Sequence, residues 1–285
     1  MFEFKKNNFD LIRLIAALQV VIVHGYEHFG FNGGKWFINI LSIFPGVPVF
    51  FVISGFLIAA SWERSSSLNS YLKNRFLRIY PALWGCFIFS IVILFIFFSP
   101  QVSFYDFFQW AAAQVTIGQF YNPDFLRGFG VGVLNGSLWT IPIEIQFYLL
   151  LPLLYIFFKK ISWNKLILYS LVFGLVLINQ FYFHLRFDAE GLLIKLFGVT
   201  IFPYLYIFFF GIILQRNLIF VEKYLANNAL ILFVLYLVSV AISSELGVSY
   251  QGNSLNPLAT LALSLLTISI SYSNVEKFSN ILKGN

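Results

Sequence analysis

Charge is scarce in this sequence of 285 residues, because Asp, Glu, Lys and Arg together make up 11% of it while hydrophobic residues make up 59%. A soluble globular domain carries about 25% charged residues. The mean hydropathy of +0.83 leaves too little polar surface to cover a globule in water. The composition therefore excludes a soluble domain and predicts an integral membrane protein with spanning helices.

Cysteine and histidine are also scarce. The single cysteine, Cys86, excludes an internal disulfide and a metal cluster built on cysteine. His24 and His28 stand at helical spacing, beside Glu27, and would share a helix face. No third or fourth ligand is evident, and His184 falls in a predicted outer loop, so we predict no metal site.

Long apolar runs are abundant, and they predict an all-α polytopic bundle. Each run is near the length of about 20 residues that a bilayer core requires. The apolar stretch at residues 104–120 contains Asp106 and three glutamines, so we interpret it as an interfacial or re-entrant helix that does not cross. We predict eight spans, at residues 9–28, 38–60, 79–99, 138–158, 164–183, 192–214, 228–243 and 256–273.

The distribution of basic residues predicts the orientation. With the N-terminus in the cytoplasm and residues 104–120 not crossing, fourteen of the eighteen Lys and Arg fall on the inner side. The basic residues are divided among short loops, which does not indicate a nucleic-acid partner. The start of the chain has no small-residue cleavage site after its apolar run, so we expect a retained first helix.

Two ionisable residues lie inside apolar segments. Glu144 interrupts "SLWTIPIEIQFYLLLPLLY", and an acidic group at the centre of a membrane helix costs about 2.5–3.5 kcal/mol. His24 lies about 22 Å along its helix from Phe9, and Glu144 about 9 Å below the opposite surface. In a core of about 30 Å the two would lie at similar depth.

A histidine and a carboxylate at matched depth indicate chemistry. A carboxylate that accepts from one imidazole nitrogen raises the basicity of the other, which can then take a proton from an alcohol. The alternative is a structural polar pair between helices, which membrane proteins also use. We predict a functional pair, His24 and Glu144.

Two further motifs allow two interpretations each. Arg75 and Arg78 share a helix face and could grip phosphate groups, or could simply anchor the helix at the inner boundary. The segment 44–62 contains Pro45, Pro48 and Ser54-Gly55, which predicts a kinked helix that lines a cavity, or close helix packing at small residues.

Four stretches in this order resemble acyltransferase family 3, the polytopic membrane acyltransferases that modify bacterial surface sugars. They are "LIRLIAALQVVIVH", "FFVISGFLI", "KNRFLRIYPALW" and "GSLWTIPIEIQFYLLLPLL". The resemblance implies transfer of an acyl group, usually acetyl from cytosolic acetyl-CoA, to a hydroxyl of a saccharide such as an O-antigen or exopolysaccharide. It implies no metal cofactor, and a location in the bacterial inner membrane.

The same resemblance implies roles for individual residues. His24 matches the family's first-helix histidine, considered catalytic, and Glu144 matches its glutamate. Arg75 and Arg78 match its R-x-x-R motif, linked to acyl-CoA, and Arg13 matches its first-helix arginine. We add as substrate-binding or supporting candidates three residues within these stretches: Trp139, Ser54 and Tyr80.

One departure from the family pattern concerns the end of the chain. The family generally has ten spans, whereas this sequence stops after an eighth, so we expect residues 1–285 to be a single acyltransferase domain truncated at its C-terminus. Two other functions stay open at this point. They are a transporter or flippase of lipid-linked sugars, and an inactive membrane scaffold.

Overall fold

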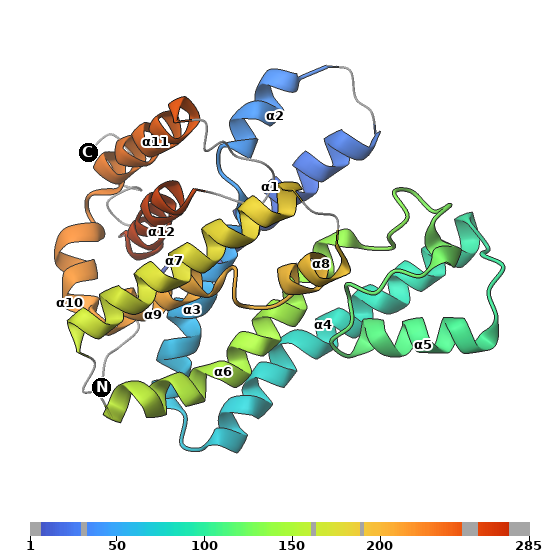
Figure 1. Cartoon of the computed structure of the whole chain (residues 1–285), viewed down its shortest axis with the longest axis horizontal. Coiled ribbons are helices and arrows are strands. Elements are labelled where there is room, and N and C mark those ends of the chain that lie inside the picture. Colours follow the sequence, from blue (N-terminus) through green and yellow to red (C-terminus); the bar gives the residue numbers. More distant parts are fainter. Residues whose placement is uncertain (1–6, 30–32, 161–163, 189–190, 247–255, 274–285) are drawn as a thin grey trace, which may run out of the picture. The chain divides into compact units, whose positions relative to one another are not determined.

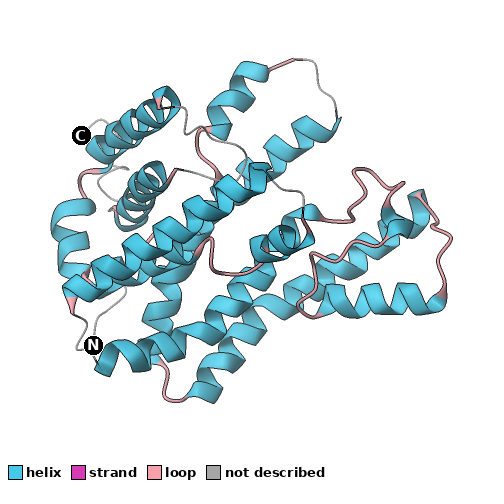
Figure 2. Ribbon diagram, in the orientation of Figure 1, coloured by secondary structure: helices cyan, strands magenta, loops and turns pink. Residues whose placement is uncertain are grey.

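The computed structural model describes residues 7–29, 33–160, 164–188, 191–246 and 256–273. Every regular element in these ranges is a helix, as predicted (Figure 1, Figure 2). The elements in chain order are α1 (Phe9–Phe29), α2 (Lys35–Ser42), α3 (Gly46–Arg64), α4 (Leu68–Phe97), α5 (Phe104–Val115), η1 (Asp124–Leu126), η2 (Gly136–Trp139), α6 (Thr140–Lys160), α7 (Lys165–Asp188), α8 (Leu192–Gly198), α9 (Leu205–Arg216), α10 (Leu218–Phe220), η3 (Val221–Leu225), α11 (Ala229–Glu245) and α12 (Pro257–Tyr272).

The helices form two compact units. Unit 1 consists of Met1–Ala60, Val172–Asn179 and Tyr204–Asn285, and unit 2 consists of Ser61–Leu171 and Gln180–Pro203. In unit 1, α12 packs against α11, α9 and α1. In unit 2, α4 packs against both α5 and α6.

The helix lengths establish a polytopic membrane protein. Among the described residues, five stretches are long and apolar enough to cross a bilayer, and a sixth is added if α9 and the 218–225 segment, bent by 83°, count as one span. The first five correspond to the first five predicted spans. Helices α11 and α12 coincide with the last two predicted spans, but with 17 and 16 residues they are shorter than the five stretches above. Helix α5 ends after 12 residues, below spanning length, as expected for a segment that does not cross.

The predicted kink near Pro45 takes the form of a break between α2 and α3. Gln19 of α1 bridges this break, because its Nε2 donates to the carbonyl oxygen of Leu41 at 3.1 Å and its Oε1 accepts from the N–H of Gly46 at 3.0 Å. The hydroxyl of Tyr236 on α11 donates to the carbonyl oxygen of Ile43. These side chains satisfy backbone groups that the interrupted helix leaves open.

A second break corrects the predicted span at 192–214, which is two helices, α8 and α9. Pro203 lies in the connection and has no N–H to continue a helix. Gln146 of α6 binds the first part of this connection: its Nε2 donates to the carbonyl oxygen of Val199 at 3.0 Å, and its Oε1 accepts from the N–H of Ile201 at 3.0 Å. A glutamine side chain therefore binds backbone groups at each of the two breaks.

Close packing of α3 on α9 accounts for Gly55. A Cβ placed on Gly55 would lie 2.1 Å from the carbonyl oxygen of Phe208, and one on Gly211 would lie 2.4 Å from that of Val52. The two backbones touch where each helix has a glycine, and α3 runs without a break through this point. The small residues of α3 thus serve close helix packing, the second of the two predicted interpretations.

The segment after α5 packs on α4 through a small core of its own. Phe87 and Leu94 of α4 are buried with Trp110 of α5 and with Leu126. The indole N–H of Trp84 donates to the carbonyl oxygen of Val115 at 3.0 Å. These contacts hold the segment 116–135 against the α4–α5 pair.

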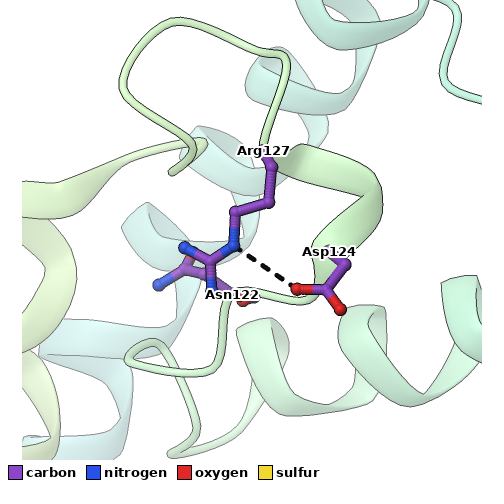
Figure 3. Close-up of polar contacts among 3 residues, drawn as sticks. All are labelled: Asn122, Asp124 and Arg127. Atoms are coloured by element: carbon purple, nitrogen blue, oxygen red, sulfur yellow. Dashed lines mark hydrogen bonds and ion pairs between the residues drawn. The ribbon is translucent and has the colours of Figure 1, made fainter.

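The surface of this segment carries an exposed ion pair (Figure 3). Nε of Arg127 lies 3.5 Å from Oδ1 of Asp124, and Nη2 of Arg127 donates to the carbonyl oxygen of Asn122 at 3.4 Å. Such an exposed pair contributes at most about 1 kcal/mol. The buried aromatic residues, not this pair, therefore supply most of the stability of the loop.

We expect Gly55→Ala to destabilise the protein, because the added Cβ would collide with the backbone of α9. Overpacking of this kind costs about 1–3 kcal/mol. Thermal unfolding in detergent, followed by size-exclusion chromatography, measures the effect. Gly174→Ala on α7 is the matched control, because a Cβ there meets nothing within 4 Å. Equal unfolding midpoints for the two variants would contradict the close packing of α3 on α9.

We expect Gln146→Leu to lower the unfolding midpoint as well. It leaves the carbonyl of Val199 and the N–H of Ile201 without their side-chain partner, and a buried unsatisfied group costs about 1–3 kcal/mol. Gln109→Leu is the control, because Gln109 lies exposed on α5. A Gln146→Leu protein as heat-resistant as the Gln109→Leu protein would show that the bridge contributes no stability.

Candidate functional site

Three of the predicted site residues lie in unit 1. Arg13 and His24 are half-buried on α1, and Ser54 is buried on α3 with 7% of its surface exposed. The bridging residue Gln19 lies between Arg13 and His24 on the same helix, about 8 Å along the axis from His24. The break between α2 and α3 therefore helps to fix the height and rotation of the helix that carries both residues.

A hollow of about 420 Å³ lies between α1 and α2, on the same turns of α1 as His24. Its lining is mostly apolar. The residues that line it, from α1, from α2 and from the two glycines before α2, are Val21, Ile22, Gly25, Tyr26, Gly33, Gly34, Phe37 and Ile38. The end of α1 that carries His24 is therefore bordered by an apolar recess.

The other predicted residues lie in unit 2, where Glu144 and Trp139 are half-buried. Trp139 is the last residue of η2, directly before α6, and Glu144 lies in the second turn of α6. The hydroxyl of Tyr148 donates to Oε1 of Glu144 at 2.6 Å. An O–H···O⁻ bond of this length is among the strong, charge-assisted ones. The carboxylate thus has a hydrogen-bond donor one helical turn away on its own helix.

Arg75 lies on α4 beside two aromatic rings. Its Cζ is 6.0 Å from the ring centroid of Tyr71 and 5.7 Å from that of Tyr148. Its Nη2 donates to the hydroxyl of Ser61 at 3.0 Å. The Nε and Nη1 atoms are buried and have no hydrogen-bond partner within the described part of the chain. Most buried polar atoms have a partner, so these two atoms of Arg75 are an exception within the described structure.

Arg78, three residues further along α4, has a different environment because it is exposed. Tyr80 lies on another side of the helix, where its ring stacks on Phe76 at 4.4 Å and contacts Trp84 at 5.7 Å. The R-x-x-R motif is thus one buried and one exposed guanidinium. Tyr80 packs with Phe76 and Trp84, whereas Arg75 contacts the rings of Tyr71 and Tyr148.

Sequence reasoning missed the residues that surround Arg75. Tyr71 is fully buried and its hydroxyl donates to the backbone carbonyl of Tyr148 at 3.1 Å, which ties α4 to α6. Trp62 packs edge-on against Tyr71 at 5.1 Å. The available signal was spacing, since Tyr71 precedes Arg75 by four residues and Tyr148 follows Glu144 by four.

The structure thus brings Glu144 and Arg75 into one unit, linked through Tyr148, while His24, Arg13 and Ser54 belong to the other unit. Within the described ranges there is no group of three or more His, Cys, Asp or Glu residues that could hold a metal ion. The side chains of Glu27 and His28 lie outside the described part of the structure.

Comparison with known proteins gives one family and several relatives. A model of an acyltransferase domain, that of acyltransferase family 3, matches residues 6–283. Nodulation protein 10 of Rhizobium leguminosarum bv. viciae is 32% identical over 220 residues, which cover 73% of this chain and 59% of that protein. No solved structure matches.

Two further relatives are named as O-acetyltransferases. The O-acetyl transferase of Shigella phage Sf6 is 32% identical over 51% of this chain and 45% of its own length. The peptidoglycan O-acetyltransferase OatA of Listeria monocytogenes serovar 1/2a is 31% identical over 58% of this chain and 27% of its own length. The chain therefore spans about half the length, or less, of these curated relatives.

Proposed function

Since the chain belongs to acyltransferase family 3, we propose that it is a membrane O-acyltransferase. It would move an acyl group, most simply acetyl, from cytosolic acyl-CoA to a hydroxyl of a cell-surface or lipid-linked saccharide. The observation that carries the proposal is the family match over residues 6–283, which includes every candidate site residue. The names of the phage and Listeria relatives support acetyl as the group and a saccharide as the acceptor class.

The donor would bind at the arginines. The buried Nε and Nη1 atoms of Arg75 lack partners in the described structure, and a phosphate oxygen of CoA would supply them. Arg78 is exposed and could take a second phosphate oxygen, and Arg13 is a third candidate. The bound thioester would supply an activated acyl carbon, which the acceptor attacks.

The acceptor would react at His24. In this proposal His24 takes the proton of the saccharide hydroxyl as its oxygen attacks the thioester carbon. The C–S bond breaks, and CoA leaves as a thiol after receiving that proton. Glu144 would act as the carboxylate that orients or stabilises the imidazole, with Ser54 and Trp139 in supporting roles. A route through an acyl-histidine would use the same residues.

We propose eight spans with the N-terminus in the cytoplasm of a bacterial inner membrane. The positive-inside bias of the loops supports the orientation. Helices α11 and α12, about 25 Å long, would complete the count with the interrupted α8–α9 segment. Breaks bridged by Gln19 and Gln146 are compatible with helices that border a polar passage.

The experiment that tests the function uses the whole chain in membrane vesicles with acetyl-labelled acetyl-CoA and a lipid-linked saccharide. Transfer of the label to the saccharide is the expected result. A transporter or flippase of lipid-linked sugars, which could also use broken helices, would leave the label on CoA while moving the sugar across the vesicle membrane. An inactive scaffold would do neither, and both of these results overturn the proposal.

We expect His24→Ala to reduce acetyl transfer by at least about 100-fold, because general-base catalysis contributes about 10²–10⁴-fold. The amount of protein in the membrane should stay unchanged. His184→Ala, at an exposed position of α7, is the control. Transfer by His24→Ala at the rate of the control would remove His24 from the mechanism.

We expect Arg75→Ala to raise the KM for acetyl-CoA by about tenfold or more, through the loss of charge-assisted phosphate contacts. Lys73→Ala, at an exposed position of the same helix, should leave KM close to the wild-type value. Initial rates over a range of acetyl-CoA concentrations measure both. If both substitutions changed the KM for acetyl-CoA equally, the change would come from the loss of surface charge and not from the loss of a donor site.

A further inference from the structure

Tyr148 is a buried residue with two roles in its surroundings. Only 4% of its surface is exposed, and its hydroxyl donates to Oε1 of Glu144 at 2.6 Å. Its ring faces the guanidinium of Arg75, with 5.7 Å between Cζ and the ring centroid. One side chain therefore contacts both the candidate carboxylate and the candidate donor-binding arginine.

The position of Tyr148 is fixed from α4. Tyr71, which is fully buried, donates from its hydroxyl to the backbone carbonyl of Tyr148 at 3.1 Å. Tyr71 also presents its own ring to Arg75, at 6.0 Å. Arg75 thus contacts the rings of Tyr71 on α4 and Tyr148 on α6, and the hydrogen bond between these two tyrosines joins the two helices. A cation on these rings is held without using its N–H groups.

The N–H groups of Arg75 are only partly used. Nη2 donates to the neutral hydroxyl of Ser61 at 3.0 Å, while Nε and Nη1 are buried without a partner in the described part of the chain. A buried N–H group without a hydrogen-bond partner carries a desolvation cost, and a bound oxygen atom would remove this cost. The hydrogen bonds of Arg75 are therefore complete only when a hydrogen-bond acceptor, such as a phosphate oxygen of the acyl donor, is bound.

We infer that Tyr148 is a positioning residue that couples the donor site at Arg75 to the carboxylate of Glu144. The inference rests on the proposed function and extends it to a residue for which the family resemblance implied no role. The hydroxyl orients the carboxylate for the transfer step, and the ring supports the guanidinium that grips the donor. The two parts of one side chain should therefore affect different kinetic constants.

The competing interpretation is purely structural. A tyrosine one turn from a glutamate on a membrane helix can simply satisfy a buried carboxylate. Such a role would change stability, but it would not separate kcat from KM. The two interpretations therefore differ in which constant each atom of Tyr148 controls.

Three variants of the whole chain separate these interpretations. Tyr148→Phe removes the hydroxyl and keeps the ring, while Tyr148→Leu removes both. Tyr155→Phe is the matched control, because the hydroxyl of Tyr155 on the same helix donates to Oε1 of Glu63 at 3.0 Å, at an exposed position. Each variant is assayed for acetyl transfer, for binding of CoA alone to the purified protein, and for thermal unfolding.

We expect Tyr148→Phe to lower kcat about 10- to 100-fold, as a misplaced reacting group does. Its KM for acetyl-CoA and its affinity for CoA should stay within about twofold of the wild-type values. Tyr148→Leu should show the same loss of kcat and, in addition, CoA binding weaker by about tenfold, because the support for Arg75 is gone. Tyr155→Phe should match the wild-type protein in every measurement.

Each other result decides against the inference. A Tyr148→Phe protein with wild-type kcat, or one that loses no more activity than Tyr155→Phe, overturns it while leaving the proposed function intact. If the wild-type protein binds CoA but transfers no acetyl, the proposed function fails and the inference fails with it. If Tyr148→Leu does not fold, Tyr148→Phe and its control are sufficient to decide.

Discussion

The constraint on which this structure depends is that no backbone N–H or C=O can remain unpaired in hydrocarbon. Two of its apolar segments are interrupted, at residues 43–45 and 199–204, and each interruption frees such groups. A glutamine carboxamide is well suited to repair this, because it carries a donor and an acceptor on one rigid plane. Gln19 donates to a carbonyl before the first break and accepts from an N–H after it, and Gln146 makes the same two kinds of bond to Val199 and Ile201 within the second.

These two glutamines lie on the helices that carry two of the candidate site residues. Gln19 is on the helix of His24, and Gln146 lies two residues from Glu144 on α6. A side chain that makes two directed hydrogen bonds fixes both the height and the rotation of its helix. Within each unit, the element that repairs the break is therefore the element that presents a candidate reactive residue. In this fold, the helix that binds each broken segment also carries a candidate site residue.

The sequence predicted the elements that depend on composition and spacing. The first five spans, a helix that does not cross within 104–120 (observed at 104–115) and the interruption near Pro45 follow from hydropathy and proline chemistry, which act locally. The break at 199–204 was missed although Pro203 lies in it, because the segment as a whole has spanning length, and what stabilises it, Gln146, is more than fifty residues away. The surroundings of Arg75 were missed because they depend on packing: Tyr71 and Tyr148 meet only after α4 and α6 pack, and Ser61 contacts Arg75 from α3.

Glu144 and Arg75, both half-buried in unit 2, each contact Tyr148. A direct salt bridge between the two would satisfy both charges but would use the arginine N–H groups that a phosphate needs. Here the hydroxyl of Tyr148 donates to the carboxylate of Glu144, and two tyrosine rings face the guanidinium of Arg75. The hydrogen-bond partner of that guanidinium is a neutral serine. The positive charge is thus held in place with Nε and Nη1 unbound within the described residues. Within an apolar segment Glu144 therefore has a hydrogen-bond donor in Tyr148, one turn away, and the ring of the same tyrosine faces Arg75.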